Sequence, residues 1–160
     1  MSGPIVVRTA ALADADGIAA FHTHCWNEAY RGIVPDQYLD GVSVEDRAVR
    51  WRHRLASDLR QTRLALRHDL IDGVVSWGPS TDAELGGLEL MSLYVAPHSR
   101  GSGTADELMH RSIGTEPAHL LVFEANLRAR AFYSKHGFRP DGHRQLDTDT
   151  GVPEVRMVRR

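Results

Sequence analysis

The chain has 160 residues, of which 42% are hydrophobic and 25% are charged, and its formal net charge is −2 at pH 7. These values are typical of one globular domain with a real core, expected here to span residues 1–160, and they exclude a strong electrostatic attraction to nucleic acid or to an anionic membrane. No apolar run approaches the roughly 18 residues that cross a bilayer.

Cysteine and histidine usage narrows the chemistry further. Cys25 is the only cysteine, which excludes an internal disulfide and argues against a cysteine-based zinc site. The nine histidines show no metal-ligand spacing, so no metal is expected. The N-terminal segment lacks the basic and apolar regions of a signal peptide, and a cytoplasmic location is therefore expected.

Two helices are predicted after a first strand at residues 5–8. Aspartates at positions 14 and 16 suit the start of the first helix, and Gly32 and Pro35 end it. Ser43 and Asp46 resemble a capping pair for the second helix. The apolar positions that recur at helical spacing are Ile18, Phe21, Cys25 and Ala29 in the first helix, and Trp51, Leu55 and Leu59 in the second.

Six strands and two helices are predicted after Ser57. Strand-like runs at 63–68 and 71–78 flank an Asp-rich turn at 69–73, and a loop leads to the strongest strand, 88–95. A helix at 104–113, a strand at 119–125, a helix at 128–138 and two strands around 143–147 and 154–159 follow. The order β-αα-βββ-α-β-α-ββ predicts an α/β (α+β) fold: a mixed, mostly antiparallel sheet of six to seven strands with helices on both faces.

A glycine-containing turn at 100–105 joins the strongest predicted strand to a helix. Gly101 and Gly103 clear side chains from a place where backbone N–H groups and a helix start converge, which suits a phosphate or pyrophosphate. A P-loop would need Gly-Lys-Ser/Thr, but Gly103 is followed by Thr104, and a Rossmann turn would need a glycine where Asp106 stands. On its own, the segment fits either an anion cradle or a plain strand-to-helix turn.

Two motifs resemble those of the GNAT N-acetyltransferase superfamily. The turn is similar to its pyrophosphate loop, Gln/Arg-x-x-Gly-x-Gly/Ala, at Arg100, Gly103 and Ala105. The second motif, N-x-x-A-x-x-F-Y-x-x-x-G-F, is matched by Asn126, Ala129, Phe132, Tyr133, Gly137 and Phe138. The motif order and the element order both fit, so the resemblance covers essentially the whole chain. One departure is the short stretch between the motifs, where the helix is expected to have lost about two turns and the outer edge of the adenine site is less defined.

The resemblance implies that the chain uses acetyl-CoA as co-substrate. Backbone groups of Leu93, Tyr94 and Val95 would pair with the pantetheine arm as another strand would, and Asn126 would contact the arm where two strands splay. The pyrophosphate would be held by Arg100, Gly101, Ser102, Gly103, Thr104 and Ala105. The basic residues Arg128, Arg130 and Lys135 either add positive charge near the 3′-phosphate or form a solvated helix face.

The resemblance further implies direct attack of an amine on the thioester within a ternary complex. An alkyl amine has a pKa of about 10.4, so a base must accept its proton at neutral pH. By its motif position, Tyr133 would protonate the leaving thiolate or pack beside Phe132. Glu89 is the candidate base, expected on the face of Leu93 and Val95, and its alternative is an exposed bystander. The reserve candidates are His22, His24 and Glu28.

The resemblance implies an acceptor pocket built by the first two helices and the C-terminal hairpin. Trp26 and Tyr30 lie one helical turn apart and are the candidate acceptor-binding residues, with Tyr38 and Trp51 nearby, although ordinary core packing is the alternative. The expected function is N-acetylation of a small primary amine. The alternatives are a protein or tRNA-borne amine and a catalytically silent acyl-CoA sensor. No nucleic-acid or membrane partner is expected, and a homodimer is suggested only by analogy.

Overall fold

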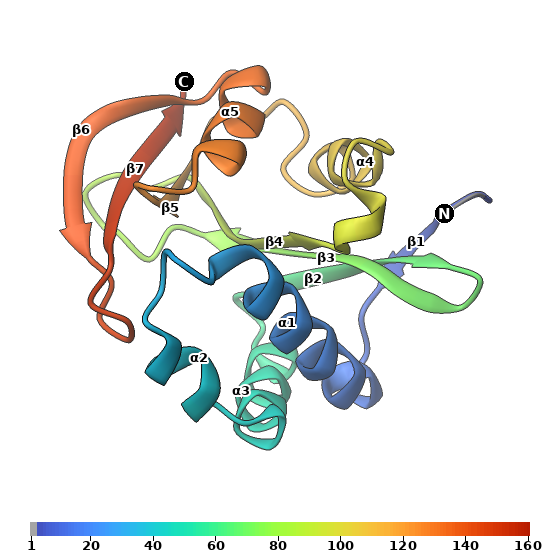
Figure 1. Ribbon diagram of the computed structural model, residues 1–160. Coiled ribbons are helices and arrows are strands. Elements are labelled where there is room, and N and C mark those ends of the chain that lie inside the picture. The colour runs from blue at the N-terminus through green and yellow to red at the C-terminus, as the bar shows by residue number, and fades with distance from the viewer. Residues whose placement is uncertain (1–2) are drawn as a thin grey trace.

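The structure, a computed structural model that describes residues 3–160, is built on a seven-stranded sheet (Figure 1). The sheet order is β1-β2-β3-β4-β5-β7-β6, and all neighbouring pairs are antiparallel except β4 and β5. The strands are β1 (Val6–Thr9), β2 (Gln61–Arg67), β3 (Leu70–Pro79), β4 (Leu88–Val95), β5 (Ala118–Phe123), β6 (Arg139–Leu146) and β7 (Pro153–Arg159). The predicted mixed, mostly antiparallel sheet is confirmed.

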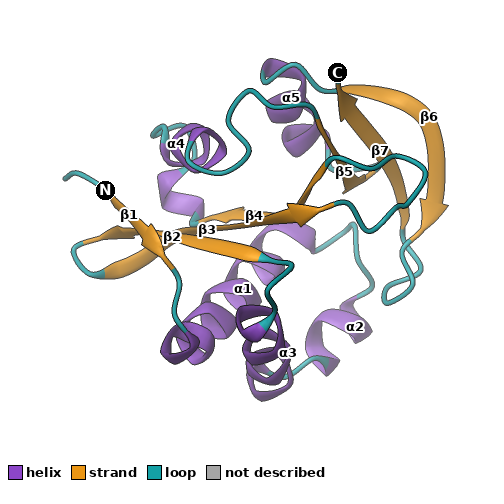
Figure 2. Ribbon diagram, turned by 180° about the vertical axis from the view of Figure 1, so that it is seen from behind, coloured by secondary structure: helices purple, strands orange, loops and turns teal. Residues whose placement is uncertain are grey.

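Helices cover both faces of the sheet, as predicted. Figures 1 and 2 show α1, α2 and α3 on one face and α4 and α5 on the other. The helices are α1 (Ala15–Tyr30), α2 (Asp36–Gly41), α3 (Val44–Ala56), α4 (Thr104–His110) and α5 (Leu127–Lys135), with short 3-10 turns η1 (Leu12–Asp14) and η2 (Pro97–Ser99). None of the helices formed by residues 3–160 has both the length and the apolar character needed to cross a bilayer.

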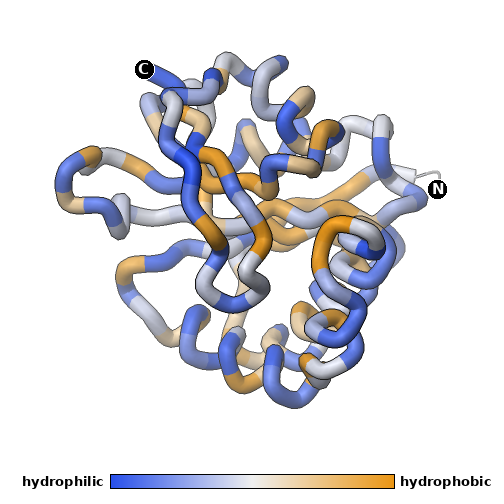
Figure 3. The backbone as a smooth tube through the Cα atoms, turned by 60° about the vertical axis from the view of Figure 1, so that its left-hand side comes forward, coloured by the Kyte–Doolittle hydropathy of each residue, from blue (hydrophilic) through white to orange (hydrophobic). Residues whose placement is uncertain are grey.

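Three apolar clusters fill the space between these layers. The largest lies between the sheet and α4 and α5, and includes Trp77, Leu90 and Leu108. A second packs α1 and α3 on the other face around Trp51. The third, separate cluster consists of Val34, Leu39, Phe123 and Val152, with Trp26, Tyr30, Ile33 and Tyr38 packed against it. Figure 3 shows the hydrophobic segments concentrated along the central strands.

The two central strands, β4 and β5, separate soon after they meet. β4 is paired with β3 from Leu88 to Val95. With β5 it forms only two residue pairs, Leu88 with Ala118 and Glu89 with His119. Beyond these pairs, no strand in the part of the chain that the structure describes pairs with the β5 side of β4, so the expected splay of the two strands is present.

A β-bulge interrupts β4 at Met91. Ser76 and Trp77 are consecutive in β3, but they pair with Ser92 and Leu90, so Met91 is an extra residue without a partner. Because side chains alternate along a strand, one extra residue reverses which face the following side chains occupy.

The bulge places Glu89 on the α3 face of the sheet. Glu89 pairs with Gly78, where an added Cβ would point at the backbone of Leu59, just after α3. Leu93 and Val95, in contrast, pack into the core on the α4 and α5 face. The predicted shared face of Glu89 with Leu93 and Val95 is therefore wrong, because alternation was counted through the bulge.

Other predicted boundaries also differ from the structure. The helix predicted at 104–113 ends at His110, and the short helix α2 was not predicted. Leu59 lies beyond α3 and is 69% exposed, so it does not belong to the apolar side of that helix. The predicted cap at Ser43 is confirmed, since its hydroxyl accepts the Asp46 N–H at 3.0 Å. Asp14 instead pairs with Arg8 at 2.8 Å.

Candidate functional site

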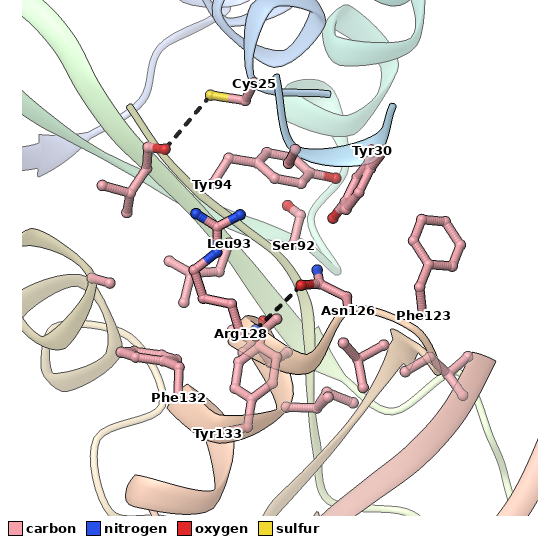
Figure 4. A pocket seen from close by; sticks show the side chains of 18 of the residues that line it. Cys25, Tyr30, Ser92, Leu93, Tyr94, Phe123, Asn126, Arg128, Phe132 and Tyr133 are labelled. Carbon is pink, nitrogen blue, oxygen red and sulfur yellow. Dashed lines mark hydrogen bonds between the residues drawn. The ribbon is translucent and has the colours of Figure 1, made fainter. Parts of the chain in front are cut away.

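A pocket of about 740 Å³ lies where β4 and β5 separate (Figure 4). Its walls come from α1, the end of α3, β4, the glycine turn, the start of α4, β5, α5 and the β6–β7 hairpin. Twelve of the predicted site residues line it: Trp26, Tyr30, Glu89, Leu93, Tyr94, Val95, Arg100, Gly101, Gly103, Ala105, Asn126 and Tyr133. Two predicted residues, Ser102 and Thr104, line a second cavity on the other side of the turn.

The glycine turn presents backbone donors to this pocket. Gly101 and Gly103 have φ angles of 78° and 93°, a region that favours glycine. Within residues 3–160, no hydrogen bond satisfies the backbone N–H groups of Gly101, Gly103, Thr104 or Ala105. Several free N–H groups on one short turn can together donate to an anion.

A buried carboxylate, Asp72 of β3, supports the turn from beneath. One of its oxygens accepts a hydrogen bond from the Ser99 hydroxyl at 2.5 Å, and the other accepts from the Thr104 hydroxyl at 2.9 Å and from Arg67 at 3.4 Å. Ser102 joins the same network, since its hydroxyl lies 3.0 Å from that of Thr104. Asp72 therefore connects the residues before and after the turn, and the Ser102 and Thr104 side chains belong to this support.

The sequence reading missed Asp72 because it was assigned to a turn at 69–73. The positive φ angles lie instead at His68 and Asp69, and β3 begins at Leu70. Asp72 is only 2% exposed. Burial raises the pKa of its carboxyl, but the hydrogen bonds from Ser99 and Thr104 and the charge of Arg67 outweigh this effect, so the pKa lies below its usual value. The signal in the sequence that could have identified Asp72 is its position as a single aspartate within the apolar run of β3.

Tyr133 of α5 lines the pocket with its ring packed among aromatic side chains. Its ring centroid is 5.5 Å from that of Phe132 and 6.0 Å from that of Phe138. Burial, followed by the neighbouring Tyr94, raises the pKa of the Tyr133 hydroxyl. The phenol is therefore protonated at neutral pH and is able to donate a hydrogen bond or a proton.

Glu89 lines the pocket from the opposite face of β4. One carboxylate oxygen accepts the Thr81 backbone N–H at 2.8 Å and the Thr81 hydroxyl at 2.7 Å. Within the described chain, the second oxygen makes no hydrogen bond, which leaves it able to accept one from a bound molecule. The loop before β4 thus orients this side chain.

An aromatic wall formed by Trp26, Tyr30 and Phe123 lies on the α1 side. The ring centroids of Trp26 and Tyr30 are 4.8 Å apart, and that of Phe123 lies 5.1 Å from Tyr30 and 5.9 Å from Trp26. Burial raises the pKa of the Tyr30 hydroxyl, an effect that the amide of Asn126 partly offsets. The same Asn126 caps α5, since its side-chain oxygen accepts the Ala129 N–H at 3.3 Å.

Two buried titratable groups of α1 are held uncharged. Burial, followed by nearby arginines, lowers the pKa of His22 to about 2, and its Nδ1 accepts the Trp51 indole N–H at 3.1 Å. Trp51 is fully buried in the core and does not line the pocket. Burial raises the pKa of Cys25 to about 12, and its thiol lies 3.8 Å from the Val95 carbonyl (Figure 4). The other reserve candidates, His24 and Glu28, are exposed.

Basic side chains of the loop and α5 differ in where they lie. Arg100 and Arg128 line the pocket, and burial and the charge of Arg128 lower the pKa of Arg100. Lys135 also lines the pocket but pairs with Asp106 at 2.9 Å. Arg130 instead donates to the Glu124 carbonyl at 2.9 Å. Among residues 3–160, no three His, Cys, Asp or Glu side chains gather as metal ligands.

Comparisons with known proteins agree with these features. A model of the acetyltransferase (GNAT) domain matches residues 61–140. A protein of Mycobacterium bovis named as an uncharacterised N-acetyltransferase is 29% identical over 140 residues, which is 83% of this chain and 88% of that protein.

Two solved structures illustrate the shared fold. The PaiA N-acetyltransferase of Thermoplasma acidophilum, in complex with coenzyme A, has a TM-score of 0.75 at 18% identity and covers 99% of both chains. A ribosomal-protein-alanine N-acetyltransferase of Brucella melitensis has a TM-score of 0.69 at 22% identity, over 96% of this chain and 98% of that one.

We expect Asp72→Asn to lower the free energy of unfolding by about 3 kcal/mol at pH 7, because Arg67 loses its buried counter-charge. The wild-type advantage is fully present above the unfolded-state pKa of about 3.9 and is lost as the pH falls through the lower folded-state value. Urea denaturation of both proteins at pH 7 and pH 3 measures the difference, which should shrink in acid. The exposed Asp58→Asn is the control, and equal stability of wild type and Asp72→Asn at pH 7 would refute the role given to Asp72.

Proposed function

This chain belongs to the acetyltransferase (GNAT) family, and we propose from this premise that it acetylates the primary amine of a small molecule by direct attack on acetyl-CoA. Its relatives and fold make it an acetyl-CoA-dependent acyltransferase. The observation that carries the finer proposal is the pocket between the splayed strands, where the two motif segments and the aromatic wall meet in one cavity.

The chain's own residues fit acetyl-CoA along β4 and the glycine turn. Within residues 3–160, the β5 side of β4 lacks a strand partner beyond Glu89, so the backbone groups of the alternate residues Leu93 and Val95 are available to the two amides of the pantetheine arm. The unpaired N–H groups at Gly101 to Ala105 suit the pyrophosphate, with Arg100 and Arg128 beside them. When bound, acetyl-CoA supplies the thioester carbonyl that an amine attacks.

In this proposal, Tyr133 acts as the general acid. Its phenol faces the pocket from α5, and within the described chain no hydrogen bond occupies it. Because burial raises its pKa, it carries its proton throughout the neutral range and can give it to, or share it with, the departing sulfur. The backbone N–H of Leu93 is the proposed donor to the oxygen that gains charge.

Glu89 acts as the general base from the other face of β4. Thr81 holds one carboxylate oxygen, which leaves the second to accept a proton from the amine, directly or through water. The bulge at Met91 is what turns this carboxylate to the α3 face, away from the face of Leu93 and Val95. The acid and the base therefore approach the reacting atoms from opposite faces of one strand.

The amine acceptor would enter between α1 and the β6–β7 hairpin. Trp26 and Tyr30 line this side of the pocket together with Phe123, and the hairpin contributes Asp147 and Asp149. Aromatic rings and carboxylates both attract cationic amines. The cavity volume of about 740 Å³ is typical of small-molecule sites, which favours a small molecule over a folded protein surface.

Release of coenzyme A in the presence of a panel of small amines tests the proposed function. We expect acetyl-CoA-dependent thiol release with at least one free amine. Activity on peptide or tRNA-borne amines alone would overturn the small-molecule assignment, and calorimetric binding of acetyl-CoA with no turnover on any amine would indicate a sensor.

Tyr133→Phe should lower kcat by about a hundredfold or more, because the acid is lost while the packing of the ring remains. The dissociation constant for acetyl-CoA, measured by calorimetry, should stay within about twofold of wild type, which corresponds to a change in binding free energy of less than ~0.4 kcal/mol. Tyr38→Phe, which removes a hydroxyl outside the pocket, is the matched control. Full turnover in Tyr133→Phe would remove this residue as the acid.

Glu89→Gln should lower kcat/KM by about a hundredfold at pH 7 and recover part of it as the pH rises, because the amine then arrives already deprotonated. The pH–rate profile of the variant should therefore be steeper on its alkaline side than that of wild type. Glu84→Gln, an exposed glutamate of the preceding loop, should leave the profile unchanged. A Glu89→Gln profile that overlays the wild-type profile would assign the base elsewhere.

A further inference from the structure

Three arginines gather on the α1 and α3 face of the sheet, around two tryptophans. The guanidinium carbons of Arg54 and Arg60 lie 4.9 Å and 5.5 Å from the ring centre of Trp51. That of Arg47 lies 5.4 Å from the ring centre of Trp26. We call Arg47, Arg54 and Arg60 the arginine cluster. None of them belongs to the glycine turn or to the proposed acetyl-CoA contacts.

Within residues 3–160, the arginine cluster has no ion-pair partner, and the carboxylate whose charge acts on it is Glu89, which raises the pKa of Arg60 against the effect of burial. None of its members forms an ion pair with a carboxylate. Arg47 donates only to the Thr23 hydroxyl at 3.0 Å, and Arg60 only to the Ser92 hydroxyl at 3.3 Å. The Nε atom of Arg60 is buried with no hydrogen-bond partner.

Uncompensated buried charge is costly, so this arrangement calls for an explanation. Arg47 is 3% exposed, and Arg54 and Arg60 are half-buried. Burial, followed by the charge of Arg54, lowers the pKa of Arg60 to about 10. Contact with an indole ring stabilises a guanidinium, but it does not neutralise the positive charge. An anion placed among these groups would remove most of the penalty.

The arginine cluster borders the part of the pocket where the acceptor is proposed to bind. Arg54 itself lines the pocket, and Arg60 donates to Ser92, which also lines it. Ser92 follows the bulge at Met91 and shares the α3 face with Glu89. An anion held by Arg54 and Arg60 would therefore lie beside the proposed base.

The opposite side of the same pocket is acidic. Its lining includes Asp147, Asp149 and Glu154 of the β6–β7 hairpin. Positive charge on one side and negative charge on the other orient a molecule that carries both signs. A simple alkyl amine would leave the arginine cluster unpaired.

We propose that the arginine cluster binds a carboxylate or phosphate group of the acceptor, so that the substrates of this enzyme are small amines that also carry an anion. Arg54 and Arg60 supply the donors, Trp51 holds both guanidinium groups in place, and the amine extends towards Glu89. The catalytic part of this inference rests on the proposed function, whereas the anion site itself does not.

Tryptophan fluorescence tests the anion site without catalysis, because Trp26 and Trp51 contact the arginine cluster. The protein, with coenzyme A added to occupy the glycine turn, is titrated at constant ionic strength with phenylacetate and, separately, with inorganic phosphate. We expect a saturable change with at least one anion, and the stronger response identifies the carboxylate or the phosphate. The dissociation constant should rise about tenfold or more in Arg60→Gln and in Arg54→Gln, but not in the exposed Arg50→Gln.

Arg60→Lys, which keeps the charge, should retain part of the binding and so separates loss of charge from loss of packing. A wild-type protein that shows no saturable response to either anion, or one that titrates like Arg54→Gln, overturns the proposal. The Arg54 side chain makes no hydrogen bond within the described chain, so its glutamine variant removes the charge without leaving a protein partner unsatisfied.

Coenzyme A release with matched acceptors then connects the anion site to catalysis. L-phenylalanine is compared with phenethylamine, and O-phosphoethanolamine with ethanolamine. We expect kcat/KM to be about tenfold or more higher for the anionic member of one pair, with this ratio falling towards one in Arg54→Gln and unchanged in Arg50→Gln. Turnover without any preference for the anionic members overturns the inference and leaves the proposed function standing. Absence of turnover with every amine refutes the proposed function, and the fluorescence titration then decides the anion site alone.

Discussion

The structure depends on a strand that is paired along one edge and largely unpaired along the other. β4 is hydrogen-bonded to β3 throughout, but it meets β5 at only two residue pairs. Backbone N–H and C=O groups need partners when they are removed from water. The free edge of β4 is therefore suited to pair with an extended ligand that carries amides. Both motif segments flank this edge: the glycine turn follows β4 directly, and α5 follows the end of β5.

Much of this arrangement could be predicted from the amino-acid sequence. Apolar runs and glycine breaks predicted the element order, and the two motifs predicted which turn and which tyrosine would share a pocket. Features that depend on contacts between distant parts of the chain could not be predicted in this way. The bulge at Met91 arises from pairing with β3, and no local pattern marks it, so the face of Glu89 was predicted wrongly. Asp72 resembled a turn residue because its partners, Ser99 and Thr104, lie far along the chain.

The sheet also separates the groups that we propose to act in the reaction, because they lie on its two opposite faces. On the α4 side lie the unpaired backbone amides of the glycine turn, which Asp72 supports, and the phenol of Tyr133, which we propose as the acid. On the α3 side, Glu89, which we propose as the base, lies near the arginine cluster, and its charge acts on Arg60. Because β4 separates these two environments, the proposed base can reach the amine and the proposed acid can reach the leaving sulfur without the two groups contacting each other.

The separate cluster of Val34, Leu39, Phe123 and Val152 has a consequence for how this protein changes over evolutionary time. It supports the aromatic wall, yet it is distinct from the two cores that hold the central strands. Substitutions that reshape the wall can therefore accumulate while β4 and the glycine turn keep their geometry. After a gene duplication, a few substitutions around α2 and the last hairpin would change which amine the protein accepts. The residues proposed to bind the acyl donor would stay the same.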